Sequence, residues 1–338
     1  MSNRNPNRPE YFSAAGYVLH LLAETGNQFT DFQPYVAAIN DRGFVAFQAV
    51  LHDGASGAYV TDGASITCAI AAGIGPLASI CSHPDIDLDV GMACYATDRS
   101  GARIVIEARS GALRTIARDA GPLGPTINAR GRVAFRIDRH REGAAILVGD
   151  GQSISEVAAR NERFMDFQGL PVINDRGAVA FRADLVGGGQ GIYCAHEGRV
   201  ATIAEAGPVF AELGTFPVLD SAGAVAFVAS LTDERSGIFV ADHGRVDTAL
   251  DTTGAFESFR GVLFAAAGAL VFYGTPRGGE LGIFSGPDPV RDRILGVGMP
   301  FLGSTVAEFA LNPVSINLSG QLAIRVALAD GRQVIVRA

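Results

Sequence analysis

The chain has 338 residues, more than one ordinary hydrophobic core fills, so its length predicts either several domains or a repeat architecture. Its formal net charge is −8, and its 27 basic residues are all arginines that form no evident cluster, which argues against a nucleic-acid-binding surface. The 42 glycines and the low fraction of charged residues, 18%, are typical of a protein with many tight turns.

The N-terminal segment carries no recognisable export signal. Residues 1–10 are polar, and no apolar stretch after them is long enough to span a bilayer. The four cysteines, at positions 68, 81, 94 and 194, show no C-x-x-C spacing, so we interpret them as small apolar residues in a reducing compartment rather than as a disulfide or metal site. These features predict a cytoplasmic protein with no membrane partner, in which residues 1–16 form a flexible lead-in.

A short phrase recurs about every 40 to 50 residues. Its clearest copy, residues 173–181, contains the turn 174–177 (Asn-Asp-Arg-Gly) and then Val179-Ala180-Phe181. Asn first and Gly fourth are typical of a type I turn, and the alternation of large and small side chains is typical of a strand with two unlike faces. Val179 and Phe181 are expected to fill one gap between neighbouring repeats, and Ala180 is expected to face the other. Marked by its glycine, the phrase occurs at Gly43, Gly91, Gly131, Gly177, Gly223, Gly268 and Gly320.

Each full repeat is predicted to be a meander of four strands. The strand expected at 17–23 precedes the first full unit and resembles the last strand of a later one. The fourth unit has strands at 168–173, 178–185, 191–195 and 199–204, but the last has only three, at 312–316, 321–328 and 333–337. The opening strand supplies the missing fourth, which closes a ring and removes exposed sheet edges. The sequence therefore predicts an all-β, seven-bladed β-propeller of four-stranded blades as one domain, residues 17–338.

The repeated unit resembles a known family. Asn-x-x-Gly-x-x-Ala-Phe, followed later in three repeats by Gly-Ile-Tyr or Gly-Ile-Phe at 191–193, 237–239 and 282–284, is similar to the tandem NxxGxxAF-repeat proteins of bacteria. The resemblance covers nearly the whole chain and implies a propeller. Many members of that family are exported and anchored at the cell surface, and this chain departs from them because it has neither signal. The resemblance implies no particular activity and leaves a cytoplasmic enzyme open.

Five repeats carry an acid 11 or 12 residues before the glycine of the phrase, where the chain is expected to enter the innermost strand. If these entrances form one mouth of a central channel, a ring of carboxylates there could bind a hard cation such as Ca²⁺ or Mg²⁺. The alternative interpretation is that each acid lies in an exposed loop and only solvates it. The predicted metal ligands are Asp31, Asp166, Glu212, Glu257 and Glu308.

The second repeat departs most from the common pattern. It places His83 and Asp85 at the expected channel mouth, where a histidine beside carboxylates could act as a general base or a ligand. The alternative is a surface histidine in a degenerate blade. Asp85, Asp87 and Asp89 alternate along the chain, so they are expected to share one face and line the channel. Two further polar side chains complete the site, and the predicted catalytic residues are His83, Asp85, Arg260 and Tyr35.

The residues leave two classes of function open. The first is an enzyme that acts on a small molecule at the channel mouth, by metal-assisted hydrolysis, isomerisation or cyclisation, and it predicts that the site residues converge. The second is a non-catalytic ligand-binding or protein-interaction scaffold, which predicts an exposed apolar patch. No phosphate-binding loop, H-E-x-x-H motif or G-x-S-x-G elbow is present, and the absence of Trp disfavours a lectin.

Overall fold

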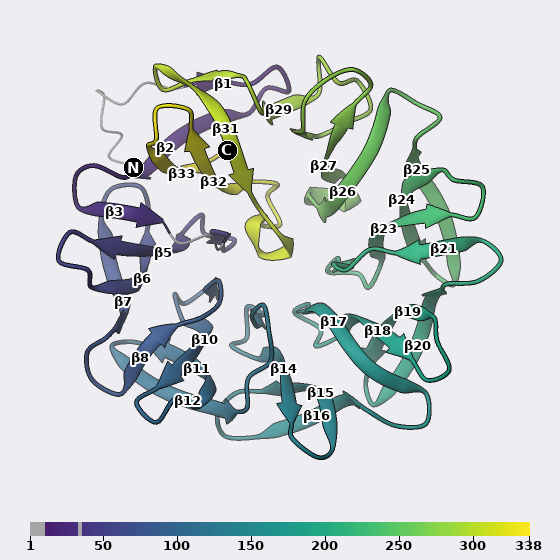
Figure 1. Cartoon of the computed structure of the whole chain (residues 1–338), viewed down its shortest axis with the longest axis horizontal. Helices are drawn as coiled ribbons and strands as arrows, with labels where there is room; N and C mark the ends of the chain where they lie inside the picture. The colour runs from purple at the N-terminus through teal and green to yellow at the C-terminus, as the bar shows by residue number, and fades with distance from the viewer. Residues whose placement is uncertain (1–10, 33–35) are drawn as a thin grey trace.

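The computed structural model describes residues 11–32 and 36–338, which form a ring of seven antiparallel sheets around a central channel (Figure 1). In each sheet, or blade, the first strand lies nearest the channel and the last lies toward the rim. The predicted seven-bladed β-propeller is therefore confirmed. No helix among the described residues has the length and apolar character needed to cross a bilayer.

The blades follow one another along the chain. The strands of blades one to four are β3 (Phe29–Phe32), β4 (Ala38–Ile39), β5 (Val45–Leu51), β6 (Ser56–Thr61) and β7 (Ile66–Ala72); β8 (Leu77–Ile80), β9 (Asp85–Ile86), β10 (Met92–Asp98), β11 (Arg103–Arg109) and β12 (Ala112–Arg118); β13 (Thr126–Ile127), β14 (Val133–Arg139), β15 (Gly143–Gly149) and β16 (Ile154–Ala159); and β17 (Phe164–Ile173), β18 (Val179–Leu185), β19 (Gln190–His196) and β20 (Arg199–Glu205). The strands of blades five to seven are β21 (Phe210–Leu213), β22 (Val218–Leu219), β23 (Val225–Leu231), β24 (Ser236–Asp242) and β25 (Arg245–Asp251); β26 (Phe256–Phe264), β27 (Leu270–Pro276), β28 (Gly282–Phe284) and β29 (Arg293–Gly296); and β30 (Pro300–Phe301), β31 (Ser304–Ala310), β32 (Ala323–Leu328) and β33 (Gln333–Arg337).

The N-terminal strand closes the ring as predicted. β2 (Val18–Glu24) pairs antiparallel with β33, so the seventh sheet contains strands from both ends of the chain (Figure 1). A short additional strand, β1 (Tyr11–Phe12), pairs with the outer side of β2. The side chain of Leu22 is buried with Ile335 and with Phe29 of blade one, so the closing strand also seals the contact between the seventh blade and the first.

The innermost strand begins earlier than expected and has two parts. In blade five, β21 pairs with the end of β23 and β22 pairs with its beginning, whereas in blade four both parts belong to the continuous strand β17. A bulge near the start of the first part recurs in six blades. In the last blade the expected strand at 312–316 is instead a 3-10 turn, η2 (Pro313–Ser315), whose first backbone amides are capped by Asn312.

Packing between blades follows the alternation in the repeated phrase. Val179 and Phe181 of β18 are buried against Ala134 and Val148 of blade three, whereas Ala180 packs with the core of blade five. The predicted orientation of these side chains is therefore confirmed. Three or four aromatic rings meet edge to face in several blades, with Phe256, Phe259, Phe272 and Phe284 forming the set in blade six.

Candidate functional site

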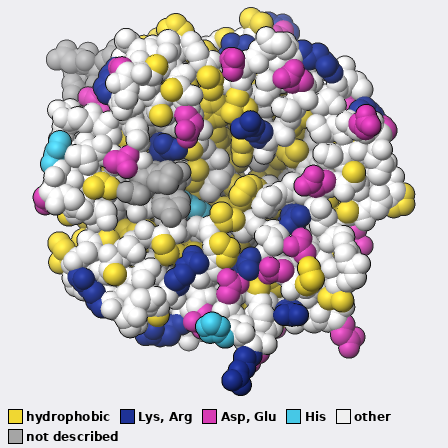
Figure 2. Space-filling model, in the orientation of Figure 1, with side chains coloured by type: hydrophobic (Ala, Val, Ile, Leu, Met, Phe, Trp, Pro, Cys, Tyr) yellow, Lys and Arg dark blue, Asp and Glu magenta, His cyan; other side chains and the backbone are white. Residues whose placement is uncertain are grey.

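A cavity of about 750 Å³ lies in the channel, at the end where the first strand of each blade turns into the second. All seven blades contribute to its wall, through the ends of their inner strands and through these turns. The hollow at the centre of the ring, with hydrophobic side chains gathered around it, is visible in Figure 2. A cavity of this volume matches the size of pockets that hold small organic molecules.

The repeated Asn builds this end of the channel. The Asn174 Oδ1 atom accepts hydrogen bonds from the amides of Arg176 and Ala178, at 3.1 and 3.0 Å, and so caps its own turn. Its Nδ2 atom donates to the carbonyl of Asp220 in the next blade, at 2.9 Å. The equivalent hydrogen bond joins neighbouring blades at three other places. The Nδ2 atoms of Asn40, Asn128 and Asn317 donate to the backbone carbonyls of Asp87, Asn174 and Asn40, respectively.

In blade two, Asp87 takes the place of this Asn. The prediction that Gly91 is the glycine of this turn is therefore wrong by one residue. Asp87 Oδ1 accepts from the amides of Asp89 and Gly91, as Asn174 Oδ1 does from the residues two and four positions later. The place of the turn glycine is thus taken by Val90, whose φ is +64°. A β-branched residue in the left-handed region is strained, and such strain is concentrated at functional sites.

Asp85 is the most strongly perturbed group on the cavity wall. Its side chain is 6% exposed, and its two oxygens accept hydrogen bonds from the amides of Ile86 and Ile127, at 2.8 and 2.7 Å. Burial raises the pKa of this carboxyl to about 7, and the charge of Asp87 adds to the rise, although both backbone hydrogen bonds oppose it. Asp85 is therefore a cavity group that changes its charge near neutral pH.

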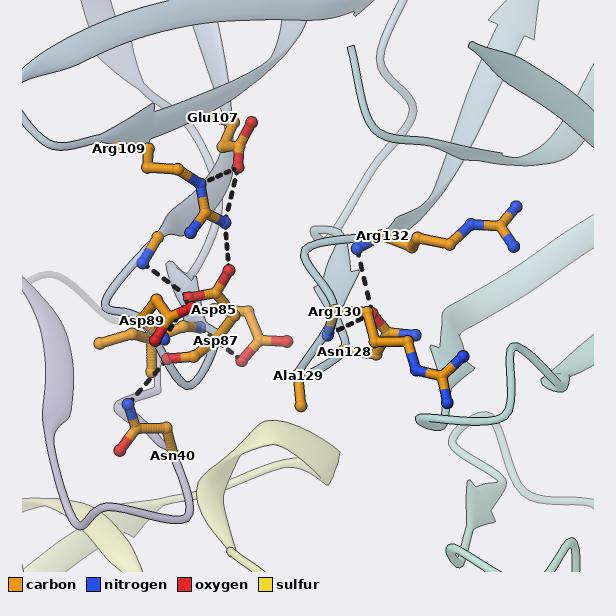
Figure 3. A network of polar contacts seen from close by, with 12 residues as sticks. Asn40, Asp85, Asp87, Asp89, Glu107, Arg109, Asn128, Ala129, Arg130 and Arg132 are labelled. Carbon is orange, nitrogen blue, oxygen red and sulfur yellow. Dashed lines mark hydrogen bonds and ion pairs between the residues drawn. The ribbon is translucent and has the colours of Figure 1, made fainter. Parts of the chain in front are cut away.

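The neighbouring Asp87 contacts an arginine at the end of β11 in the same blade (Figure 3). Its second oxygen forms an ion pair with Arg109, which also bonds to the buried Glu107 at 2.9 Å. The guanidinium lies beside Gly91 and Gly131, where any Cβ would collide with it or press against it. The sequence did not indicate this network, because Arg109 lies 22 residues after Asp87 and on a strand that carries no part of the repeated phrase.

His83 does not line the cavity. It is buried between blades two and three, with its Nε2 atom 3.1 Å from the carbonyl oxygen of Pro125. A Cβ on Gly124 would overlap the imidazole ring. The irregular segments before the inner strands of blades two and three therefore pack against each other. Burial lowers the pKa of His83 to about 4.

His83 and Asp85 should give the protein opposite dependences of stability on pH. The pKa of His83 is about 4 in the folded protein and the ordinary 6.5 in the unfolded chain, whereas that of Asp85 is about 7 in the folded protein and 3.8 in the unfolded chain. As pH rises, the folded state therefore gains stability through His83 between pH 4 and 6.5 and loses stability through Asp85 between pH 3.8 and 7. Relative to the unmodified protein, the free energy of unfolding of His83→Gln should therefore fall as pH rises from 4 to 6.5, and that of Asp85→Asn should rise up to pH 7. Urea unfolding at several pH values measures both, and pH-independent differences would contradict the assignment.

The five predicted metal ligands lie along the outer parts of the inner strands, and none lines the cavity. Asp31 accepts from Gln333 at 2.7 Å, Asp166 lies 3.1 Å from Arg136, and Glu308 lies 3.0 Å from Arg325. Glu212 and Glu257 are exposed. Among the described residues, no three or more His, Cys, Asp or Glu side chains are grouped so that they could hold a metal ion.

The two remaining predicted catalytic residues are Arg260 and Tyr35. Arg260 is exposed on β26 and does not line the wall, whereas Tyr35 lies outside the described residues. The wall instead includes carboxylates from the turns, which the sequence analysis treated only as turn formers. These carboxylates are Asp41, Asp175 and Asp220, together with Asp242 at the end of β24. The repeated turn was the sequence feature that could have predicted the first three.

The electrostatic character of the wall is one-sided. The described residues that line the cavity include six aspartates, namely Asp41, Asp85, Asp87, Asp175, Asp220 and Asp242, and no Arg, Lys or His. Blades five and six add an apolar portion that contains Val218, Val240 and Phe264. Such a wall attracts cations and offers apolar surface to the rest of a small molecule.

Comparison with known proteins identifies a family and a fold. A model described as a family of unknown function, DUF7453, matches residues 93–335. The comparison does not confirm the resemblance to NxxGxxAF-repeat proteins, which stays a prediction. No curated protein sequence matches the chain.

Solved structures with low sequence identity share the propeller fold. The β-propeller domain of the Trilobed protease from Pyrococcus furiosus has a TM-score of 0.60 at 12% identity, over 89% of this chain and 94% of that one. An oligogalacturonate lyase from Vibrio parahaemolyticus gives 0.60 at 10% identity, over 98% and 96%. A puromycin-hydrolyzing peptidase from Mycobacterium tuberculosis gives 0.55 at 13%, over 98% of this chain and 53% of that one. At these identities the likeness extends to the fold alone.

Proposed function

This chain belongs to DUF7453, a family of unknown function, and we propose that it binds a small cationic molecule in the central cavity. The observation that carries the proposal is the composition of the wall: among the described residues, six aspartates and no basic residue line the cavity of about 750 Å³. An ammonium group beside Asp85 would stabilise the charged carboxylate and lower its pKa from about 7. Binding near neutral pH should then release a proton.

Calorimetric titration with hexylamine, hexanol and hexanoate tests this proposal. Hexylamine should bind most tightly, and its heat in buffers of different ionisation enthalpy should reveal proton release at pH 7. Asp85→Asn should weaken hexylamine binding by about tenfold, because a hydrogen bond to a charged group contributes roughly 1.5–3 kcal/mol, and should abolish the proton release.

The matched control is Asp89→Asn, which removes the same charge from a side chain that is 70% exposed and does not line the cavity. This variant should bind hexylamine as the unmodified protein does. Equal binding of hexanoate and hexylamine, or unchanged binding by Asp85→Asn, would contradict the proposal.

A second candidate is an enzyme that acts on a small molecule in the same cavity, by hydrolysis, isomerisation or cyclisation. It is favoured by one observation, the cavity-facing carboxyl of Asp85 whose pKa is raised to about 7, which suits a general acid or base at neutral pH. Turnover of any bound compound should then be lost in Asp85→Asn and kept in Asp89→Asn. Turnover that persists in Asp85→Asn would exclude Asp85 as the acid or base.

A further inference from the structure

Three exposed arginines of blades three and four, Arg130, Arg132 and Arg176, lie in or next to cavity-lining turns and form no ion pair among the described residues. The exposed Arg132 extends toward the next blade, with its Nη1 atom 3.7 Å from the position that a Cβ of Gly177 would take. Figure 3 shows its side chain directed away from Asp85 and Asp87. Arg176 donates from Nη1 to the carbonyl of Ala222, a cavity-lining residue, at 3.3 Å.

The arginines of blades one and two near the same turns are neutralised. Arg42 lies 3.3 Å from Asp89, and Arg109 is paired with both Asp87 and Glu107. Aspartates of blades one, two, four and five line the interior of the cavity, whereas guanidinium groups without an ion pair lie beside the turns of blades three and four.

The unpaired guanidinium groups affect which cations can bind in the cavity. A simple amine that binds beside the aspartates lies near the unpaired guanidinium groups of blades three and four, whose like charge weakens its binding. A molecule that also carries a carboxylate gains charge-assisted hydrogen bonds from the same guanidinium groups, whose planar donors match a carboxylate. These guanidinium groups thus discriminate between two classes of cation that the wall alone would treat alike.

We propose that the ligand is amphoteric, with an ammonium group that lies against Asp85 and a carboxylate that lies at Arg132 and Arg176. This inference rests on the proposed function and names the class of molecule for the same cavity. An amino acid, or a short peptide end, has the required pair of charges.

Calorimetric titration with aminohexanoate and hexylamine, which share one apolar body, tests the inference. The unmodified protein should bind aminohexanoate about tenfold more tightly than hexylamine, because of the hydrogen bonds from a guanidinium to the carboxylate. In the double variant Arg132→Gln/Arg176→Gln this preference should disappear, while hexylamine binding is kept or improves. The control double variant Arg141→Gln/Arg199→Gln removes two exposed arginines that form no ion pair among the described residues and should keep the preference.

The titrations distinguish failure of the amphoteric ligand from failure of the cationic ligand. Equal affinity of the unmodified protein for the two compounds, or a preference that survives in Arg132→Gln/Arg176→Gln, would overturn the amphoteric ligand and leave the cationic one. Absence of binding by either compound would overturn both. Thermal unfolding of each variant without ligand confirms that it is folded, since all four substituted side chains are exposed.

Discussion

A protein that lacks residues 1–24 is expected to lose its folded state. The deletion removes β2, and with it the hydrogen-bonded partner of β33 and the side chains of Leu19 and Leu22, which are 3% and 2% exposed. At about 2 kcal/mol for each large apolar side chain and about 1 kcal/mol for each hydrogen bond, the loss is roughly 5–10 kcal/mol. This is on the order of the whole stability of a typical domain, about 5–15 kcal/mol. Near-ultraviolet circular dichroism and gel filtration of the truncated protein measure the effect.

Two further samples make this prediction specific to the closing strand. Deletion of residues 1–10 leaves β1 and β2 complete and should keep the thermal midpoint of the full chain. Addition of a synthetic peptide that spans residues 11–25 to the longer deletion should restore the folded signal, because the peptide supplies the missing strand in trans. A truncated protein that unfolds at the same temperature as the full chain would contradict closure of the ring by β2.

Gly169→Ala is expected to be the most destabilising single methyl substitution among the glycines of blade four. Gly169 has a φ of +73° and lies in the bulge of β17 between Gln168 and Val172. A Cβ there would overlap the carbonyl oxygen of Thr215 in the next blade and lie 3.0 Å from its carbonyl carbon. Both obstacles are backbone, so relief requires a shift between blades. With roughly 1–2 kcal/mol for the left-handed backbone and 1–3 kcal/mol for overpacking, the expected loss is about 2–5 kcal/mol.

The matched control for this substitution is Gly207→Ala. Gly207 has no positive φ, and no heavy atom lies within 4 Å of its added Cβ, so its free energy of unfolding should change by less than about 0.5 kcal/mol. Urea unfolding of the two variants compares them directly. Similar denaturation midpoints for Gly169→Ala and the unmodified protein would show that blades four and five are not in the close contact described.

The repeated phrase predicted the fold because its chemistry is local. The cap that Asn174 forms on its own turn and the alternation of Val179, Ala180 and Phe181 both act within a few residues, so they leave a mark in the sequence. The same local pattern failed in blade two, where Asp87 caps the turn and Val90 holds the position of the glycine. A carboxylate can replace the amide as an acceptor, and the sequence pattern does not reveal that exchange.

The site could be predicted only in part. Asp85 was expected to line the channel and does, because its place next to the repeated turn fixes its position. His83, two residues earlier, was expected beside it and lies instead between two blades against Pro125. The acids before the inner strands were expected at the channel, but they lie on strand segments that extend toward the rim and pair with the ends of the second strands.

By itself the sequence determined the number of blades and the borrowing of the first strand to complete the last sheet, because both follow from a repeated local pattern and from a count of strands. Only the tertiary structure decided which mouth holds the cavity, which carboxylates face it and which arginines lie unpaired beside the turns that line it. These properties depend on how seven copies of one turn converge across the ring, and side chains about 45 residues apart or more meet there without any local signal of the encounter.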